Sequence, residues 1–385
     1  MSVFVKAMME LEKQEINTNT SIKGGLWLIG SLLIILVVYG LPVYGAFLIA
    51  TFFEPIVETY FILQVEEWFL QAPMIIAEIV VGPFGLLTLG MYSFVWAFPV
   101  VVFISISIGI TTNMGLKDKL TVAVDPLLRK IGLTGRDMIP IVTGYGCNVV
   151  AVYQSKGCSS CTRKQCLSMI SFSSACSYQV GATLSLFSVA GKPWLFFPYI
   201  IILAVMGIIH TKLWYPQQQH ESYFPMKDQS LRWGNPVVIL ANVRDAIKQF
   251  FYQAMPIFLV ICMTAATLHH FKILNVLSNK VGPVLAFFSL PAEASLGILF
   301  SILRKDGILL FNERNGQLLL DLTSMELFIL IYLASTLSAC LVTLFAIAKD
   351  VSKSIAFQIA SKQAVTSVVS SLLLVIVWRI FVGNY

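Results

Sequence analysis

Apolar runs of roughly 20 residues recur along this 385-residue chain, and no other feature constrains its fold as strongly. A helix of that length crosses the hydrocarbon core of a bilayer. Charged residues make up only 12% of the chain, against about 25% in soluble domains, so a soluble core could not bury these runs. Because lipid leaves backbone polar groups to be satisfied internally, the runs predict helices. The sequence therefore predicts an all-α, polytopic integral membrane protein.

Seven apolar segments are long enough to cross the membrane, and two shorter ones are interrupted by glycine, proline and polar residues. The long segments are 26–53, 84–110, 166–190, 194–214, 254–270, 325–348 and 364–381. The two broken segments are 139–153 and 290–303. We expect about 7–8 transmembrane helices, with the broken segments forming re-entrant or kinked structures.

Basic residues between the runs predict the orientation, because lysine and arginine in short loops favour the cytoplasm. Residues 1–25 contain lysines, whereas 54–71 carries glutamates and no basic residue. We therefore expect a multi-pass protein of the cell membrane with a cytoplasmic N-terminus and the lipid bilayer as its first partner. The net charge of +6 lies in short clusters without a continuous basic patch, which argues against nucleic-acid binding.

The chain divides into two halves of similar layout. Residues 1–25 are predicted to be a cytoplasmic segment, 26–215 the first membrane half, 216–253 a cytoplasmic connector and 254–385 the second half. Each half contains a span, a short amphipathic stretch (116–131 or 273–288), a broken segment and two further spans. Loop charges place both flanks of 139–153 inside. The number of crossings agrees with the loop orientations only if 290–303 re-enters the membrane from outside. Broken segments in two oppositely oriented repeats indicate a transporter binding site; two unrelated kinked helices are the alternative.

The first broken segment contains candidate metal ligands beside two glycines. Gly144 and Gly146 are expected to act as a hinge where the backbone departs from the helix. Cys147 then offers a soft sulfur ligand and Asn148 a harder oxygen, a combination that suits a transition metal. A glycine-rich packing kink with a buried thiol would give the same sequence.

Hydroxyl groups follow one face of the segment 166–190 at helical spacing. Ser171, Ser174, Tyr178 and Ser185 are candidates for the wall of a hydrated pathway. Serine faces also serve ordinary helix packing in membranes, so both interpretations remain open.

A carboxylate follows a proline in the second broken segment. Glu293 is a candidate oxygen ligand, because an ionisable group at membrane depth is costly to desolvate and is usually functional. It could equally lie at the membrane surface, where the helix macrodipole favours an acidic residue at a helix start. Glu78 invites the same two interpretations.

Cysteines crowd into the region between 147 and 176. The loop carrying Cys158, Cys161 and Cys166 also contains basic residues, which favour reactive thiolates, and it predicts metal docking or redox sensing rather than a structural disulfide. A closed zinc site needs four ligands, so Cys147 or Cys176 would have to join these three. Unremarkable loop cysteines are the alternative. Cys262 and Cys340 lie inside apolar runs and are expected to be small buried hydrophobes.

The chain contains no phosphate-binding loop, no H-E-x-x-H helix and no nucleophile elbow. We therefore expect no enzymatic activity and no permanently bound cofactor.

Several of these motifs together resemble the membrane region of the bacterial ferrous iron transporter FeoB. They are the stretch from Gly132 to Pro140 leading into Gly-Tyr-Gly-Cys-Asn at 144–148, Leu-Pro-Ala-Glu at 290–293, and Arg-Lys-Asp at 304–306. The resemblance implies two oppositely oriented gate-type, nucleoside-recognition-like repeats, with Cys147 contacting or gating the ion. It also implies a second functional cysteine near Cys176 or Ser177.

Departures from that family bear on how transport would be driven. FeoB proteins usually carry an N-terminal GTPase domain, whereas only residues 1–25 precede the first apolar run here. We therefore expect that this chain does not bind GTP and that any GTPase is a separate subunit; a homo-oligomer is a further expectation. Val150 and Thr112-Asn113 replace a family proline and an acidic pair.

The combined expectation is transport of Fe²⁺ or a related divalent metal ion across the bacterial cytoplasmic membrane. Two alternatives follow from the same residues. One is a carrier of a nucleoside or another organic solute, because gate-type repeats are not confined to iron transporters. The other is a membrane sensor of thiol oxidation or metal that uses the Cys158 and Cys161 loop.

Overall fold

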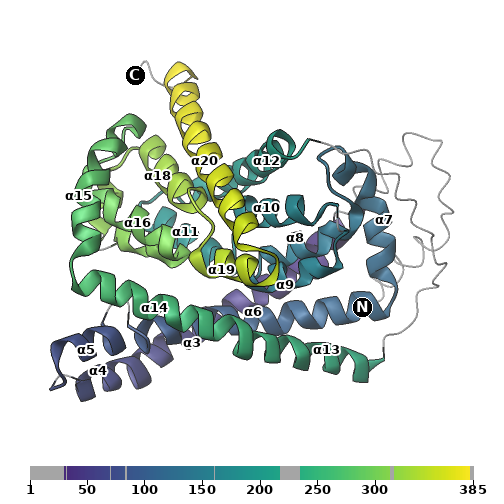
Figure 1. The fold of residues 1–385 in the computed structure, drawn as a ribbon, viewed down its shortest axis with the longest axis horizontal. Coiled ribbons are helices and arrows are strands. Elements are labelled where there is room, and N and C mark those ends of the chain that lie inside the picture. The colour runs from purple at the N-terminus through teal and green to yellow at the C-terminus, as the bar shows by residue number, and fades with distance from the viewer. Residues whose placement is uncertain are drawn as a thin grey trace.

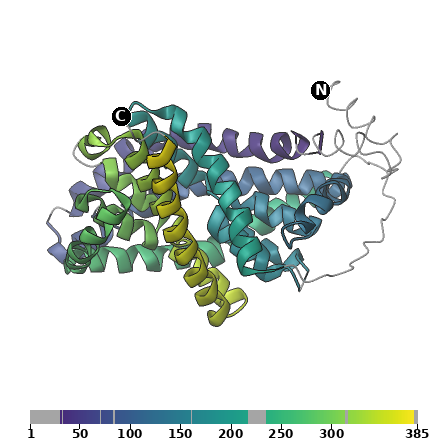
Figure 2. The ribbon, with the colours of Figure 1, turned by 90° about the horizontal axis from the view of Figure 1, so that it is seen from above.

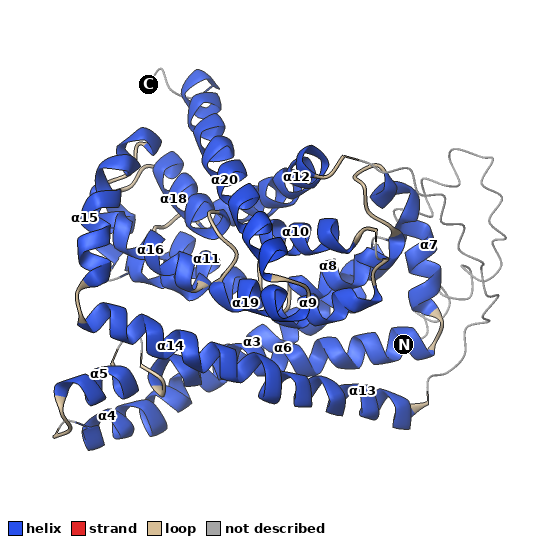
Figure 3. Cartoon of the chain, in the orientation of Figure 1, coloured by secondary structure: helices blue, strands red, loops and turns tan. Residues whose placement is uncertain are grey.

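The computed structural model describes residues 30–31, 33–69, 71–82, 85–159, 161–216, 235–312 and 316–381. Within these ranges the chain forms helices and no strand, which confirms the predicted all-α class (Figure 3). The predicted N-terminal segment 1–25 and much of the predicted connector lie outside the described residues.

In the described part of the chain, six helical stretches are long and apolar enough to cross a membrane. They are Leu33–Phe69, Gly90–Asn113, Pro193–Trp214, Pro236–His270, Ser324–Asp350 and Lys353–Ile380. The segment 166–190, predicted as one span, forms two shorter helices in succession, α10 (Arg163–Ser173) and α11 (Ser177–Val189). Six candidate spans among the described residues support the predicted polytopic membrane architecture, for which we expect about 7–8 transmembrane helices.

The N-terminal helices form one side of the molecule. The first crossing contains α3 (Leu41–Val57) and α4 (Leu63–Phe69) and is followed by the short α5 (Met74–Val81). Helix α6 (Thr88–Asn113) packs along α3 and also along α13 (Pro236–Gln249), which continues through a π-helical turn into α14 (Met255–His270). Figure 1 shows α13 and α14 running beside α6 along the length of the molecule. Helix α13 begins at Pro236, capped by Asn235, so the second part of the predicted connector is helical.

Each half then contains the predicted amphipathic helix. These are α7 (Leu116–Arg129) in the first half and α15 (Ile273–Leu285) in the second. Each follows a residue in the left-handed region, Gly115 with φ 72° and Lys272 with φ 55°. The left-handed residue ends the preceding helix and turns the chain before the amphipathic helix begins.

The first broken segment is a helical hairpin, which we call hairpin 1. Its helices are α8 (Met138–Gly144) and α9 (Asn148–Gln154), and its outer ends are the 3₁₀ turns η3 (Gly135–Asp137) and η4 (Ser155–Gly157). Because η3 and η4 contact each other, the chain enters and leaves the hairpin at the same end, as predicted.

The second broken segment forms the corresponding hairpin 2. It consists of η8 (Ala292–Ala294), α16 (Ser295–Leu303) and η9 (Lys305–Asn312), and α16 packs directly on η9. Arg304, between the two arms, is extended with φ −151° and ψ 143°. Both hairpins therefore reverse direction at a short extended stretch.

Two segments predicted as continuous spans are each broken in the middle. Extended backbone at Ser174 and Cys176 separates α10 from α11, and the break before Cys340 separates α18 (Ser324–Thr336) from α19 (Leu341–Asp350). Side chains from elsewhere take the place of some missing helical hydrogen bonds: Asn148 Nδ2 donates to the Ser174 carbonyl at 3.2 Å, and Lys305 Nζ donates to the Ser338 carbonyl. Tertiary contacts thus override the local hydropathy pattern.

The two broken helices run in opposite directions. Arg163, at the start of α10, pairs with Asp350, at the end of α19. At the other end of the molecule, Lys192, just beyond α11, donates to the carbonyl of Leu322, just before α18, at 2.8 Å. The predicted pair of oppositely oriented repeats is therefore confirmed. We call these ends the hairpin 1 face and the hairpin 2 face.

The remaining helices complete the two repeats. They are α12 (Phe196–Trp214), α17 (Gln317–Asp321) and α20 (Lys353–Phe381). Helix α20 contacts α10, α12, α18 and α19, and Figure 2 shows it in yellow beside the teal α12. It therefore joins the second repeat to the first.

Glu78 does not lie in the centre of the protein but joins α5 to the end of α14. Its two carboxylate oxygens lie 2.8 Å from His269 Nδ1 and 2.6 Å from His270 Nδ1. The hydrogen bond with His270 is the main cause that lowers the pKa of Glu78 below its ordinary value of 4.5, while partial burial opposes this. The carboxylate therefore fastens α5 to the molecule.

A carboxyl with a lowered pKa stabilises the fold above its ordinary pKa, and the effect is lost as pH falls through the lower folded value. We expect Glu78→Gln to lower the thermal unfolding midpoint at neutral pH, and the difference from wild type to shrink below pH 4.5. Thermal unfolding in detergent over a pH series measures this. The exposed Glu293→Gln serves as control, and an equal pH trend in both variants would contradict the assignment.

Candidate functional site

The two hairpin tips and the two helix breaks meet in the interior of the protein. Asn148, just after the tip of hairpin 1, donates to the carbonyl of Ser174 in the first helix break. Lys305, at the tip of hairpin 2, donates to the carbonyls of Ser335 and Ser338 around the second break. Gln363 of α20 joins the two broken helices by donating to the carbonyls of Ser171 at 3.1 Å and Thr336 at 2.9 Å.

Three cysteines lie at this junction, and each is the residue immediately before a half-helix. Cys147 precedes α9, Cys176 precedes α11 and Cys340 precedes α19. All three are half-buried, and their thiols lie within electrostatic range of one another. We call Cys147, Cys176 and Cys340 the central thiol cluster.

Backbone amides at the half-helix starts point toward the sulfur atoms. The amides of Val149 and Val150 approach the Cys147 sulfur, and that of Gln179 approaches the Cys176 sulfur. Thr343 N donates to Cys340 Sγ at 3.4 Å. Because a helix N-terminus carries partial positive charge, each sulfur lies at the positive end of a helix dipole.

Two buried cations form the tip of hairpin 2. The Lys305 ammonium lies within electrostatic range of Cys176 and Cys340 and supplies positive charge to the cluster. Arg304 points to α14, where Nη1 lies 2.8 Å from Cys262 Sγ and the guanidinium lies 4.0 Å from the Phe258 ring centroid. Hairpin 2 therefore contributes positive charge to the centre.

Three buried side-chain oxygens near the junction have no hydrogen-bond partner among the described residues. They are Asn148 Oδ1, Gln363 Oε1 and Ser171 Oγ. A buried acceptor without a donor costs free energy unless a ligand or water satisfies it. These oxygens therefore provide polar ligands beside the thiols.

Gly144 and Gly146 serve close packing at the tip of hairpin 1. Neither has a positive φ, so the backbone there does not itself require glycine. A Cβ on Gly144 would lie 2.7 Å from Ser174 Cβ, and one on Gly146 would lie 2.8 Å from Val100 Cγ1. The predicted hinge is thus a point of contact between hairpin 1, α10 and α6.

The other predicted residues are distributed unevenly. Ser171 and Ser174 are buried at the junction, whereas Ser185 is exposed in the outer half of α11. The break at Ser174–Cys176 interrupts the predicted stripe, and the side chain of Tyr178 lies outside the described part of the structure. Glu293 is exposed in η8, at the opposite end of α16 from Lys305, so the structure does not bring it to the thiols.

The cysteines of the 158–166 loop form a separate group at the hairpin 1 face. Cys158 Sγ and Cys166 Sγ lie 3.3 Å apart, and a carboxylate oxygen of Asp137 lies within 4.8 Å of both. Cys161 is exposed on the same loop and is not part of this group. Neither Cys147 nor Cys176 joins these thiols, so the fourth ligand predicted for a zinc site does not come from them.

Asp350 connects this loop to the second repeat. Its oxygens lie 2.7 Å from Lys156 Nζ and 2.5 Å from Arg163 Nη2. The Asp350 side chain is only 8% exposed, so these ion pairs are better shielded from water than surface pairs. They hold the hairpin 1 face together.

Sequence reasoning misses the roles of Cys340, Lys305 and Gln363. The apolar run around Cys340 suggests only packing, Lys305 enters as a loop charge and as part of a family motif, and Gln363 belongs to no motif. One pattern could have identified Cys340: the tripeptide Ser-Ala-Cys occurs at 174–176 and again at 338–340, at equivalent breaks of the two repeats.

Part of the chain is similar in sequence to known proteins. Residues 94–190 match the family "Gate: Nucleoside recognition", a range that includes hairpin 1, α10 and α11. A 129-residue stretch is 26% identical to the Fe(2+) transporter FeoB of Legionella pneumophila (strain Lens). It covers 33% of this chain and 16% of that relative.

Two solved structures of CNTnw align with most of the chain. The inward-facing, substrate-bound structure gives a TM-score of 0.46 at 13% identity and covers 94% of this chain and 99% of that one. The structure of a substituted variant of CNTnw in an outward-facing state gives 0.40 at 13% identity, covering 90% and 95%. The predicted resemblance to FeoB is confirmed by the sequence matches, and the part of the chain at residues 94–190 is similar to the Gate, nucleoside-recognition family.

Proposed function

We propose that this chain transports ferrous iron or a related divalent metal ion across the bacterial cytoplasmic membrane. The observation that carries the proposal is the central thiol cluster: three cysteines from both repeats at the starts of three half-helices. Supporting it, the match to FeoB is to a protein named as an Fe(2+) transporter. The N-terminus is proposed to be cytoplasmic, as the loop charges predict.

The chemistry of the cluster suits a transition metal more than a hard cation. Thiolates are soft ligands that select iron, zinc or copper over magnesium and calcium. The unpaired oxygen of Asn148 would add a harder ligand beside Cys147. Binding a dication to thiols displaces their protons, so uptake should weaken as pH falls. The positive charge of Lys305 and the helix N-termini lies beside the thiolates that metal binding would create.

In this proposal the chain acts as a carrier and not as an enzyme. The metal is cargo, no cofactor stays bound, and GTP is bound by a separate GTPase subunit if at all. The two faces are each held by contacts between repeats, at Asp350 and at Lys192, with the thiols between them. Release of one set of contacts would give the cluster access to one side of the membrane.

Metal uptake into proteoliposomes tests the proposal. Cys147→Ser is expected to lower Fe²⁺ uptake several-fold, roughly 3- to 10-fold, because the serine oxygen is a poorer ligand while Cys176 and Cys340 remain. Cys161→Ser is the matched control, since that thiol is exposed and outside the cluster, and its uptake should equal wild type. Unchanged Fe²⁺ uptake in Cys147→Ser would remove the cluster from the pathway.

A second candidate function is the transport of a nucleoside or a similar organic solute. It is favoured by the unpaired amide oxygens of Asn148 and Gln363, which could accept hydrogen bonds from hydroxyl or amino groups of a solute. The same liposomes distinguish the two. Nucleoside uptake that is indifferent to chelators and to Cys147→Ser would support this candidate and contradict metal transport.

A further inference from the structure

We propose a second metal site at the hairpin 1 face, formed by Asp137, Cys158 and Cys166, which binds a thiolate-preferring dication such as zinc. The bound metal would stiffen the loop whose Lys156 and Arg163 pair with Asp350. The three ligand atoms lie within 4.8 Å of one another. They come from three successive elements: the start of hairpin 1, the loop after η4, and α10. The site shares no residue with the central thiol cluster.

The geometry of the sulfur atoms fits a metal. Two thiolates on one tetrahedral zinc, each at about 2.3 Å from the ion, lie about 3.8 Å apart. Cys158 Sγ and Cys166 Sγ are 3.3 Å apart, so a shift of about half an ångström admits the ion. Asp137 supplies the third ligand, and water can take the fourth position.

Asp137 is a buried carboxylate that the described ion pairs do not neutralise. It is fully buried, and none of the ion pairs found among the described residues includes it. Its partners are neutral: Oδ2 accepts from Thr134 N at 2.7 Å and Thr134 Oγ1 at 3.0 Å, and Oδ1 accepts from Thr162 Oγ1 at 3.0 Å. A buried charge is costly unless it is paired or coordinates a metal, so a dication here would relieve that cost.

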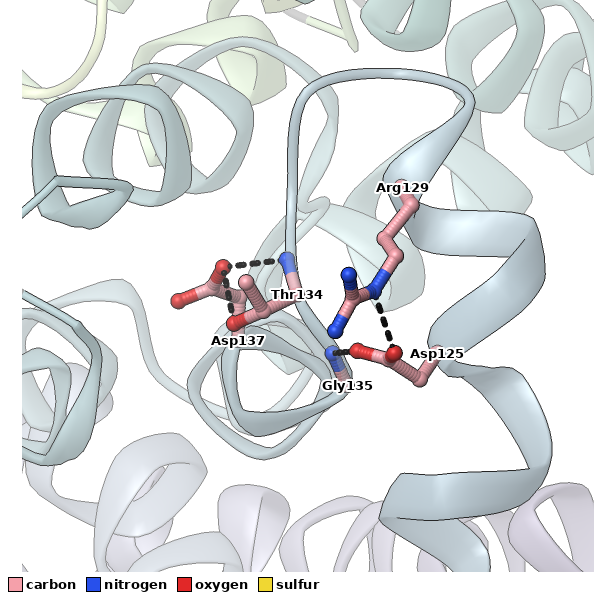
Figure 4. A network of polar contacts seen from close by, with 5 residues as sticks. All are labelled: Asp125, Arg129, Thr134, Gly135 and Asp137. Carbon is pink, nitrogen blue, oxygen red and sulfur yellow. Dashed lines mark hydrogen bonds and ion pairs between the residues drawn. The ribbon is translucent and has the colours of Figure 1, made fainter. Parts of the chain in front are cut away.

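The start of hairpin 1 is fixed before any metal binds. Asp125 of α7 accepts from Gly135 N at 2.7 Å and from Arg129 Nε at 2.5 Å, as Figure 4 shows beside Asp137. A side chain at 135 would collide with α7, because its Cβ would lie 2.1 Å from the Thr121 carbonyl oxygen. Asp137 is therefore held in place, while Cys158 lies on the loop that a metal would draw in.

A regulatory role follows from what flanks the loop. Lys156 and Arg163 lie on either side of Cys158 in sequence, and both pair with Asp350 at the end of α19. A metal that ties Cys158 to Cys166 and Asp137 restrains the loop that carries both basic residues. Bound metal should therefore slow the opening of the hairpin 1 face.

The test uses the full-length chain in membranes and in detergent under reducing conditions, with zinc as the probe. Zinc should slow maleimide labelling of Cys158 in the wild-type chain about tenfold or more, and chelation should restore it. After desalting, Cys158→Ser should hold about one zinc fewer per chain than wild type, whereas Cys161→Ser should match wild type. Zinc should also slow cargo flux more in wild type than in Cys158→Ser, because zinc that competes at the central thiol cluster acts on both chains alike.

Other outcomes would overturn the inference. If zinc leaves the labelling of Cys158 unchanged, the site does not bind zinc. This measurement uses the wild-type chain, so it does not depend on whether a variant folds. An equal zinc loss in Cys161→Ser would show adventitious thiol binding, and a Cys158–Cys166 disulfide in freshly isolated protein would show a redox pair. Because zinc content and labelling need no flux, the site can be tested even if metal transport fails.

Discussion

Lys305→Met is expected to lower metal flux at least about tenfold, equivalent to about 1.4 kcal/mol, while the chain remains folded in the membrane. The ammonium donates to the carbonyls of Ser335 and Ser338 and lies within electrostatic range of Cys176 and Cys340. Methionine fills a similar volume and avoids the cost of a buried charge, which offsets part of the lost hydrogen bonding in the free energy of unfolding. The thiolates lose their countercharge, so flux should fall more than stability does.

Three measurements separate these effects. Flux in proteoliposomes reports function, thermal unfolding in detergent reports stability, and maleimide labelling of Cys176, beside Lys305, should slow in the variant. Lys280→Met is the control, because Lys280 is exposed on α15. If Lys305→Met transports metal at the wild-type rate, Lys305 serves only to bind the backbone carbonyls after α18 and takes no part in transport.

Gly144→Ala is expected to lower the free energy of unfolding by about 1–3 kcal/mol and to reduce flux sharply. The added Cβ would lie 2.7 Å from both Cβ and Oγ of Ser174, so hairpin 1 and α10 must separate. That separation strains the hydrogen bond from Asn148 to the Ser174 carbonyl and displaces Cys147. In a helix without this contact the same change would stabilise the chain, because alanine is the better helix former.

Gly157→Ala provides the matched control, since a Cβ there meets nothing within 4 Å. Thermal unfolding and flux of the two variants should therefore diverge, with Gly157→Ala close to wild type. If Gly144→Ala is as stable and as active as Gly157→Ala, the tip of hairpin 1 is not closely packed against α10 in the membrane.

Sequence alone predicts the parts of the fold that depend on local hydropathy, charge and helical periodicity. Hydropathy locates the crossings, loop charges predict a hairpin at 139–153, and periodicity identifies both amphipathic helices. The breaks at 174–176 and before Cys340 escape such reasoning, because hydropathy averaged over a long window does not register three extended residues. What stabilises them is distant in sequence: Asn148 reaches Ser174 across 26 positions and Lys305 reaches Ser338 across 33.

The candidate site shows the same division. Motifs identify Cys147 and Cys176, and both lie at the junction. An apolar run conceals the helix start at Cys340, and the contribution of Lys305 depends on where the tip of hairpin 2 is placed. The charge of Glu293 makes it a candidate, but residue type alone does not show that η8 lies at the far end of the hairpin.

The two faces of the molecule are held by contacts of unequal strength. At the hairpin 1 face Asp350 meets two cations and is largely shielded from water, whereas at the hairpin 2 face Lys192 meets the neutral carbonyl of Leu322. Lys192 makes one charge-assisted hydrogen bond with a neutral group, whereas Asp350 makes two contacts with opposite charges. The conformational equilibrium of the empty carrier should therefore favour a state in which the cluster is accessible from the hairpin 2 face. Cargo would bind from that side, and opening the hairpin 1 face for release would cost more free energy.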